Sequence, residues 1–282
     1  MLSYRHAYHA GNHADVLKHS VLALILESLQ RKQAPYCYID THAGAGRYNL
    51  ASREAVKVGE FRAGIGRVWP HADRPAALAP YFAAIAACNP GASGELHYYP
   101  GSPVVANTFL REQDRMVVFE QHPTDATLLT KEFARMPQCR VLRGDAFTLL
   151  KGFLPPREKR GLVLIDPSYE MKTDYRAVVT LLSDALVRWA TGIYMLWYPL
   201  LERATADQLL RRIATSGTRK ILNIEFGPRA AGAGIGLWGS GLVIVNPPYQ
   251  LDAQIKNLLP WFGRVMQAEV GAPASVRWLV PE

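Results

Sequence analysis

The stretch LVLIDPSYE, residues 162–170, joins a run of four apolar residues to an acidic residue, a proline, a serine and a tyrosine. An apolar run of this length is typical of a strand buried on both faces, as in a parallel sheet. Asp166 and Pro167 then follow at the point where the strand must end. In open α/β sheets, ligands bind beyond the carboxyl ends of the strands. The stretch therefore predicts a core strand that leads into a functional loop.

Six further apolar runs alternate with helical patterns along the chain. The runs are YCYID (36–40), MVVFE (116–120), RVLRGD (140–145), IYMLWY (193–198), ILNIEF (221–226) and LVIVN (242–246). Helical patterns fill 14–32, 103–113, 123–135, 174–190, 203–215 and 251–266, and in the first of these Lys18 and His19 lie off the apolar stripe. Seven strands with intervening helices predict an α/β fold built on a doubly wound, seven-stranded, Rossmann-like sheet.

Residues 49–98 interrupt this alternation. The segment is rich in alanine, is punctuated by proline and glycine, and carries no strand signal. We interpret it as a helical insertion after the first strand. The chain then divides into residues 1–48, with an N-terminal tail, a helix and the first strand with its glycine turn, the insertion at 49–98, and the remainder of the sheet domain at 99–282.

Composition limits the class of protein. The chain has 282 residues, of which 49% are hydrophobic, and a formal net charge of +8, which favours a polyanionic partner over a merely solvated basic surface. The three cysteines are widely spaced and form no C-x-x-C pair, so neither a disulfide framework nor a thiolate zinc site is expected. No signal peptide or run of about 18 apolar residues is present, and we expect a cytoplasmic protein without a membrane segment.

A glycine turn, DTHAGAGRY at 40–48, follows the first strand and places Gly44 and Gly46 two residues apart. A tight turn alone can require glycine, but this position admits a nucleotide-like ligand. The triphosphate motif G-x-x-x-x-G-K-[ST] is absent. Asn49 occupies the third glycine position of G-x-G-x-x-G, which disfavours a dinucleotide.

Acidic residues close the next two strands. Glu120 is suited to bridging ribose hydroxyls, and Asp145 to accepting from an adenine amine, although either carboxylate alone could be a solvated strand-end charge. Ser102 is a candidate N-cap of the helix after the insertion, where a carboxylate ligand could bind. A ligand with a carboxylate, a ribose and an adenine but no phosphate fits all three positions. That ligand is S-adenosylmethionine.

The Asp-Pro-Ser-Tyr loop supplies what methylation of a base amine requires. Asp166 and the carbonyl of Pro167 could each accept one N–H and aim the nitrogen lone pair at a methyl group, and Tyr169 could stack on the base. Asp166 could then accept the proton that the amine loses. A plain turn at the strand end is the alternative. NPPY at 246–249 offers similar groups, but it follows the seventh strand, far from the glycine turn.

The N-terminus, YRHAYHAGNHADVLKH, holds four of the eight histidines. No accompanying set of carboxylates or thiols supports a metal site, so no metal is expected. Tyr4, His6 and Lys18 are instead typical of a segment that contacts a nucleic acid or covers a cofactor, with an ordinary surface role as the alternative.

Taken together, these residues closely resemble the bacterial 23S rRNA (adenine(2030)-N6)-methyltransferase family. The resemblance extends over almost the whole chain, through MLSYRHAYHAGNHADVLKH, DTHAGAGRY, YYPGSP, LIDPSYEMKTDY, GIYMLWYP, NPPY and VPE. It implies a Class I methyltransferase fold with an inserted helical subdomain. It also implies a monomer that acts on 23S rRNA, either protein-free or in an early assembly intermediate, with S-adenosylmethionine as the methyl donor.

The resemblance also implies roles for individual residues. Tyr4 would contact the RNA, Asp166 would be the proton acceptor, and the N-terminal tail would fold over the cofactor. Residues implied to contact the cofactor are His19, His42, Ser102, Glu120, Asp145, Ala146 and Asp166. Two positions depart from the usual pattern: Ser168 replaces a second proline, and Ala146 replaces a frequent glycine.

Three rival hypotheses remain open at this point. A DNA adenine-N6 methyltransferase would use the same chemistry. A non-catalytic nucleic-acid-binding protein could retain the sheet and its basic charge. A third hypothesis places the side-chain amide of a protein glutamine at NPPY.

Overall fold

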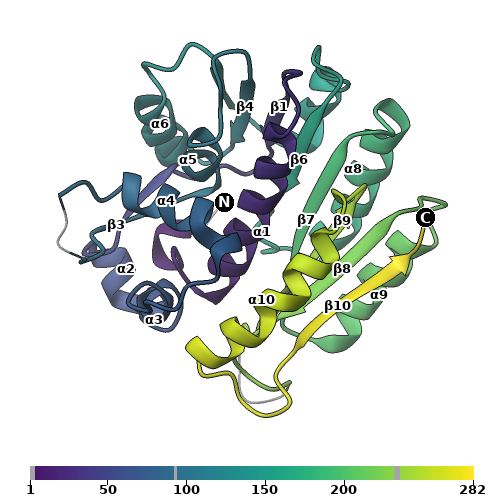
Figure 1. Ribbon diagram of the computed structural model, residues 1–282. Helices are drawn as coiled ribbons and strands as arrows, with labels where there is room; N and C mark the ends of the chain where they lie inside the picture. The colour runs from purple at the N-terminus through teal and green to yellow at the C-terminus, as the bar shows by residue number, and fades with distance from the viewer. Residues whose placement is uncertain (1–3, 92–93, 232–235) are drawn as a thin grey trace.

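The computed structural model describes residues 4–91, 94–231 and 236–282, which form a layered α/β fold around an eight-stranded sheet (Figure 1). The strand order is β10-β8-β9-β7-β6-β1-β4-β5. The strands are β1 (Cys37–Asp40), β4 (Arg115–Glu120), β5 (Cys139–Arg143), β6 (Gly161–Ile165), β7 (Ile193–Leu200), β8 (Ile221–Phe226), β9 (Gly239–Val245) and β10 (Ala274–Val280). The predicted doubly wound α/β fold is thus confirmed.

The predicted number of strands was wrong by one. All seven predicted strands form, and β10 adds an eighth at the edge, where it pairs antiparallel with β8. Because β10 is an edge strand whose residues are only partly buried or exposed, it lacks the continuous apolar run by which the other strands were predicted.

Strand direction divides the sheet. β5, β4, β1, β6 and β7 run parallel, whereas β9 runs antiparallel to both β7 and β8. The carboxyl ends of the parallel strands therefore meet at one edge of the sheet, with Asp40 of β1 in register with Val118 of β4 and Leu164 of β6. β1 lies between strands that wind in opposite directions, which is the topological switch point where such sheets bind ligands.

Helices cover both faces of the sheet (Figure 1). One apolar cluster packs α1 (His13–Gln30), α5 (Ser102–Asn107) and α10 (Leu251–Val265) against the sheet. A second cluster packs α8 (Asp174–Arg188) and α9 (Arg203–Ala214) against the opposite face. The shorter helices α6 (Pro123–Glu132) and α7 (Ala146–Leu149) follow β4 and β5. No helix in the described ranges is both long enough and apolar enough to cross a membrane.

α1 is buried on nearly all sides, which the sequence pattern did not predict. Lys18 and His19, which lie off the apolar stripe, are 4% and 1% exposed. The reason is that α4 (Ala79–Ala87) of the insertion, α5 and α10 all pack on α1. A helix covered from several directions has no solvent face, so its polar residues must find partners inside the protein.

The insertion is closed by a small two-stranded sheet in which β2 (Arg47–Asn49) pairs antiparallel with β3 (Tyr98–Pro100). Between them lie α2 (Arg53–Val58), α3 (Ile65–Val68) and α4, with three-residue helical turns. The sequence analysis missed the two short strands. After the insertion, α5 begins at Ser102 with Gly101 as its N-cap. The prediction of Ser102 as the N-cap was therefore wrong by one residue.

Candidate active site

A cavity of about 510 Å³ opens at the carboxyl ends of the parallel strands. Its walls come from the N-terminal segment, from α1 and from the loops that follow β1, β4, β6 and β7. The structure brings most of the predicted site residues together there: Tyr4, His6, Lys18, His19, His42, Gly44, Ser102, Glu120, Asp166 and Pro167. Three predicted residues do not line the cavity: Asp145, Ala146 and Tyr169.

The glycine turn after β1 forms one wall. Gly44 has a φ of +62°, and a Cβ at this position would lie 2.1 Å from the hydroxyl of Tyr48. That hydroxyl accepts a hydrogen bond of 3.1 Å from the backbone N–H of Ala45. Only glycine combines this conformation with this close approach. Gly44 itself lines the cavity.

Glu120, at the end of β4, holds the turn in place. Its carboxylate accepts hydrogen bonds of 2.7 Å from the backbone N–H groups of Gly44 and His122. Burial raises the pKa of Glu120, although these backbone donors act in the opposite direction. The carboxylate thus lies at the second strand end, beside the glycine turn, as the sequence predicted.

Asp166, at the end of β6, is held by a buried ammonium group. The Nζ of Lys18 lies 2.6 Å from Oδ2 of Asp166 and 2.9 Å from Oδ1 of Asp15. Burial raises the pKa of Asp166 above its ordinary value, and the charge of Lys18 opposes part of that rise. Burial disfavours the charge of Lys18, but the two carboxylates raise its pKa overall. Lys18 is therefore a buried cation shared between two carboxylates.

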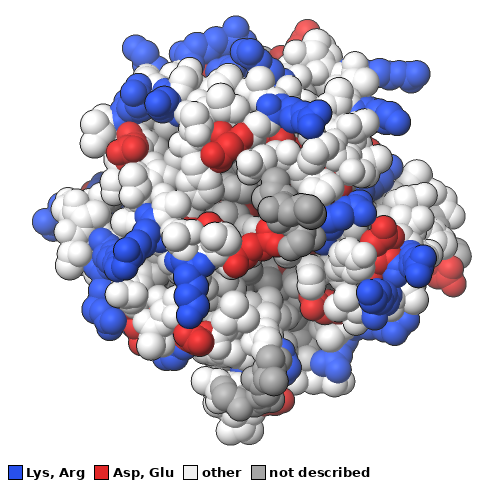
Figure 2. Space-filling view, turned by 180° about the vertical axis from the view of Figure 1, so that it is seen from behind, with Lys and Arg blue, Asp and Glu red and all other residues white. Residues whose placement is uncertain are grey.

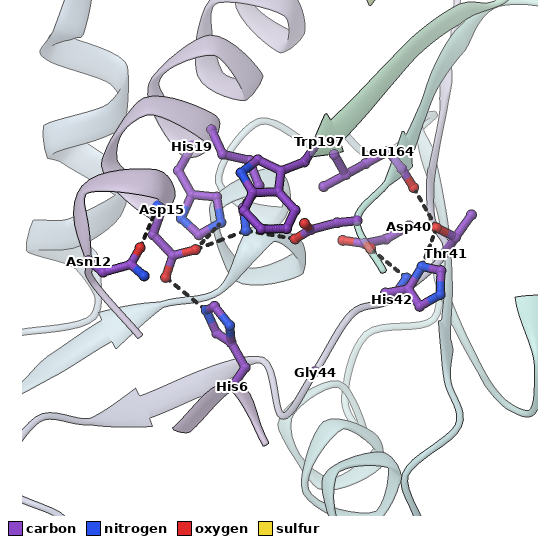
Figure 3. A network of polar contacts seen from close by, with 12 residues as sticks. His6, Asn12, Asp15, His19, Asp40, Thr41, His42, Gly44, Leu164 and Trp197 are labelled. Atoms are coloured by element: carbon purple, nitrogen blue, oxygen red, sulfur yellow. Dashed lines mark hydrogen bonds and ion pairs between the residues drawn. The ribbon is translucent and has the colours of Figure 1, made fainter. Parts of the chain in front are cut away.

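The N-terminal segment adds a second layer over this ion pair. His6 Nε2 lies 2.8 Å from Oδ2 of Asp15, and its Nδ1 lies 2.9 Å from the hydroxyl of Tyr4. The backbone N–H of Tyr4 donates a 3.0 Å hydrogen bond to Glu170, in the loop after β6. Figure 3 shows His6, Asn12 and His19 around Asp15, and Asp40, Thr41 and His42 together at the right of the view. The described part of the tail thus lines the cavity, and its folding over a cofactor stays a prediction.

Two histidines line the cavity as neutral groups. His19 Nδ1 lies 2.9 Å from the hydroxyl of Tyr99, and burial lowers the pKa of His19 to about 3. His42 Nδ1 lies 2.7 Å from the hydroxyl of Thr41, and burial lowers the pKa of His42 to about 4. The ring of His42 also packs edge-on against Phe147, with centroids 5.6 Å apart. An uncharged imidazole beside an aromatic ring suits a planar, neutral ligand group.

Tyr169 does not reach the cavity. Its ring is buried, its hydroxyl donates a 2.7 Å hydrogen bond to the carbonyl of Trp197, and its centroid lies 4.6 Å from that of Tyr175. The backbone at Tyr169 has a φ of +53°. This conformation directs the side chain into the apolar layer, so the structure does not support its predicted stacking on a base. Trp197 does line the cavity, and its ring centroid lies 5.7 Å from Nζ of Lys18, the partner of Asp166.

Asp145 is engaged in its own helix. It is the N-cap of α7, and its carboxylate accepts a 2.9 Å hydrogen bond from the backbone N–H of Phe147. Ala146 is buried behind it. Phe147 lines the cavity whereas Asp145 and Ala146 do not, so the cofactor contacts of this pair stay a prediction.

NPPY lies at the opposite end of the strands, where β7 begins and not where it ends. β9 is antiparallel to β7, so its last residue, Val245, pairs with Tyr194 near the start of β7. The Asn246 side chain donates hydrogen bonds of 2.8 Å to the carbonyls of Ala190 and Gly192. The amide is used to close the turn before β7, which leaves the hypothesis of a glutamine site at NPPY without support.

The charge of the cavity differs from that of the whole chain. Among the described lining residues there are seven carboxylates, one lysine and no arginine: Asp15, Glu60, Glu120, Asp125, Asp166, Glu170, Asp174 and Lys18. The chain as a whole carries +8. Figure 2 shows many Lys and Arg side chains toward the periphery of one face and several Asp and Glu side chains near its centre. Such a cavity suits a cationic ligand and disfavours a phosphate.

Sequence reasoning missed two residues that shape this site. Asp15 was not predicted as a site residue, although its i,i+3 spacing from Lys18 on one helix indicates an ion pair. Trp197 lies within the predicted strand IYMLWY, near the edge where the functional residues of the other strands gather. Among the described residues, no group of three His, Cys, Asp or Glu side chains is arranged to hold a metal ion.

Comparison with known proteins identifies relatives over the full length. The family model described as "Ribosomal RNA large subunit methyltransferase D, RlmJ" matches residues 33–280. Two proteins named ribosomal RNA large subunit methyltransferase J, from Escherichia coli K12 and Haemophilus influenzae Rd, are 48% and 44% identical over 100% of both chains. A crystal structure of a Legionella pneumophila protein is 34% identical, with a TM-score of 0.88 over 96% of this chain and 98% of that one.

These matches extend through the tail, the insertion and the cavity. The family model matches nearly the whole chain, and the two relatives match all of it. Both comparisons point to the family that the motifs resemble. The chain belongs to the RlmJ family of ribosomal RNA large subunit methyltransferases, which confirms the resemblance drawn from its residues.

Proposed function

We propose that the protein transfers a methyl group from S-adenosylmethionine to the exocyclic N6 of an adenine in 23S rRNA, the adenine at position 2030. The observation that carries this proposal is the convergence of Asp166 and Pro167 with the glycine turn in one acidic cavity. We further propose that it acts in the cytoplasm, as a monomer, on protein-free rRNA or an early assembly intermediate. The names of its relatives and its net charge of +8 support an RNA substrate.

The residues present fit the donor. S-Adenosylmethionine supplies a methyl group bound to a positively charged sulfur. The carboxylates of the cavity complement that charge, and the absence of arginine from the described lining residues suits a ligand without phosphate. Glu120 lies beside Gly44, where a ribose would find a carboxylate acceptor. The rings of His42 and Phe147 offer neutral surfaces to an adenine.

Asp166 and Pro167 would position the acceptor amine. Lys18 occupies Oδ2 of Asp166, and no described residue donates a hydrogen bond to Oδ1. Oδ1 would accept one N–H of the adenine amine, and the carbonyl of Pro167 would accept the other. Proline fixes its own φ, which keeps that carbonyl in place. Holding the nitrogen between two acceptors directs its lone pair toward the methyl group, and such positioning accounts for much of the rate of a bimolecular transfer.

Asp166 would also receive the proton. A methylated aryl-ammonium is strongly acidic, so even a weak base deprotonates it. Burial raises the pKa of Asp166, which makes it a better acceptor than an ordinary aspartate. Lys18 keeps the carboxylate oriented and prevents it from becoming an isolated buried charge.

The N-terminal segment would complete the site. Tyr4 and His6 line the cavity and are tied to Glu170 and Asp15. A tail held in this way excludes water from the acceptor and donor groups, which strengthens the electrostatic interactions inside. Tyr4, which is 36% exposed, would meet the RNA from the outer side.

The substrate can be tested directly. The protein is incubated with S-adenosylmethionine carrying a labelled methyl group and either deproteinised 23S rRNA or duplex DNA. We expect label in one adenine of the rRNA, mapped by nuclease digestion and mass spectrometry. Label only in DNA would establish the DNA methyltransferase alternative. Donor binding without transfer to either nucleic acid would favour a binding protein.

A further inference from the structure

The mouth of the cavity carries two exposed apolar side chains that the proposed chemistry does not use. Met171 is 62% exposed and Leu201 is 47% exposed, and both line the cavity. Exposed apolar groups that cluster at a cavity, unlike scattered ones, mark a contact surface.

These two side chains stand on a rigid base. Met171 follows the Asp-Pro-Ser-Tyr loop, and Leu201 follows the last residue of β7. Beneath them, the hydroxyl of Tyr169 donates to the carbonyl of Trp197, and the ring of Tyr169 packs on Tyr175 at the start of α8. The buried tyrosine thus ties the loop after β6, which carries Asp166 and Met171, to strand β7, which ends directly before Leu201.

Two basic residues follow Met171 closely in the sequence. Lys172 and Arg176 are exposed, and within the described part of the chain neither makes an ion pair. Arg203, at the start of α9, contrasts with them because it is paired with Glu225 and Asp207. A lysine and an arginine without acidic partners can meet phosphates at no cost in broken ion pairs.

We propose that Met171 and Leu201 form a wedge that packs against the nucleotides flanking the target adenine once that adenine has left the base stack. Lys172 and Arg176 hold the phosphates of these nucleotides. This inference rests on the proposed function. The role of the wedge is to help the target adenine leave the base stack.

The physical reason is the cost of extracting the base. Moving a base out of a helix costs a few kcal/mol in lost pairing and stacking. Apolar side chains that pack between base steps recover part of that cost in other nucleic-acid-binding proteins. Methionine suits this role because its side chain is flexible and polarisable and adapts to irregular surfaces.

The test uses two RNA hairpins that carry the mapped adenine, one with the adenine paired and one with it opposite an abasic site. The double variant M171A/L201A is compared with the unmodified protein in single-turnover methylation at saturating RNA. We expect about a tenfold loss of rate on the paired hairpin, because base extraction is costly there. On the abasic hairpin we expect a rate within about twofold of the unmodified protein, because little pairing is left to break.

Val187→Ala is the matched control, because Val187 is 88% exposed on α8 and does not line the cavity. We expect it to methylate both hairpins like the unmodified protein. Thermal unfolding of all variants checks the fold, and exposed substitutions of this kind change stability little. An equal loss on both hairpins, or no loss on the paired one, would overturn the wedge. Failure of the unmodified protein to methylate either hairpin would overturn the proposed function itself.

The basic pair gives a separate readout. Lys172→Ala and Arg176→Ala are expected to weaken binding of both hairpins equally and to reduce the slope of log affinity against log salt by about 1 each, or somewhat less. An unchanged salt slope in both variants would remove the phosphate contacts from the proposal.

Discussion

Two stretches of this chain are nearly alike in sequence but lie at opposite ends of the strands, one where the parallel strands end and one where they begin. LVLIDPSYE (162–170) and LVIVNPPYQ (242–250) each join a buried strand to a polar residue, a proline and a tyrosine. β6 is parallel to β1, and its end opens into the cavity. β9 is antiparallel to β7, and its end meets the turn that precedes β7.

The difference shows that strand direction decides what such a motif can do. At the first site, Asp166 faces Lys18 and the cavity. At the second site, the side-chain amide of Asn246 donates its hydrogen bonds to the carbonyls of Ala190 and Gly192. Both polar groups satisfy buried or half-buried partners, but the first lies where the parallel strands end together and a ligand can enter.

The largest expected effect is a loss of methylation activity in a variant at Asp166 that a variant at Asn246 does not share. Asp166→Asn removes the negative acceptor for the proton, and we expect methyl transfer to fall by about 10²–10⁴-fold, the range typical of a lost general base. Asn246→Ala should leave the methylation rate unchanged. Single-turnover assays with labelled donor measure both, and calorimetric donor binding shows whether the Asp166 variant still assembles the cavity.

The reverse pattern would invert the assignment. Full activity in Asp166→Asn together with none in Asn246→Ala would place the chemistry at NPPY. We expect the Asn246 variant to lose about 1–3 kcal/mol of unfolding free energy, because two carbonyls lose their donor. Urea denaturation measures that loss without reference to activity.

A pH profile sharpens the role of Lys18. Because Asp166 must be deprotonated to accept a proton, kcat/KM should rise with pH through the pKa of Asp166 in the free protein. Lys18 lowers that pKa against the effect of burial. Lys18→Met removes this effect, so the rise should move to higher pH, and the plateau rate should fall as well. A rise that stays at the same pH would show that another group titrates.

Donor binding by variants at two glycines, one in the cavity and one at the turn before β7, tests the same difference between the two sites. In Gly44→Ala the new Cβ would meet the hydroxyl of Tyr48 at 2.1 Å, in a backbone of positive φ. We expect at least tenfold weaker donor binding, since the positive φ alone costs about 1–2 kcal/mol. Gly192→Ala is the control at the second site, because its Cβ would meet the ring of Trp189 at 2.5 Å. Calorimetry should show normal donor affinity for that variant, at reduced stability.

The sequence predicted the parallel strands well, because strands buried on both faces must be continuous apolar runs. It predicted that Glu120 and Asp166 lie with Gly44 at one edge for the same reason. It could not predict that α1 is buried all round, since the helices that cover it come from distant parts of the chain. The ion pair of Lys18 with Asp166 spans 148 positions of sequence, and no local pattern encodes such a contact.

Side-chain direction was the other limit. Tyr169 has the residue type that stacking requires, yet its positive φ turns the ring into the core. Local propensity gives little warning of a positive φ at a tyrosine. Trp197 reaches the cavity from a strand that the sequence identified only as core. The identity of a strand-end loop is therefore easier to predict than the direction of each side chain within it.

The smallest expected effect is a difference in unfolding free energy between phenylalanine variants at Tyr169 and Tyr249. Tyr169→Phe removes the hydroxyl that donates to the carbonyl of Trp197, so we expect a loss of about 1 kcal/mol in unfolding free energy and a modest loss of rate as the loop loosens. Tyr249 is 83% exposed at the second site, and Tyr249→Phe should change neither quantity measurably. If Tyr169 stacked on the base instead, phenylalanine would keep that contact, and stability would not change. Denaturation curves that coincide for both variants would show that the Tyr169 hydroxyl does not stabilise the link between the loop after β6 and strand β7.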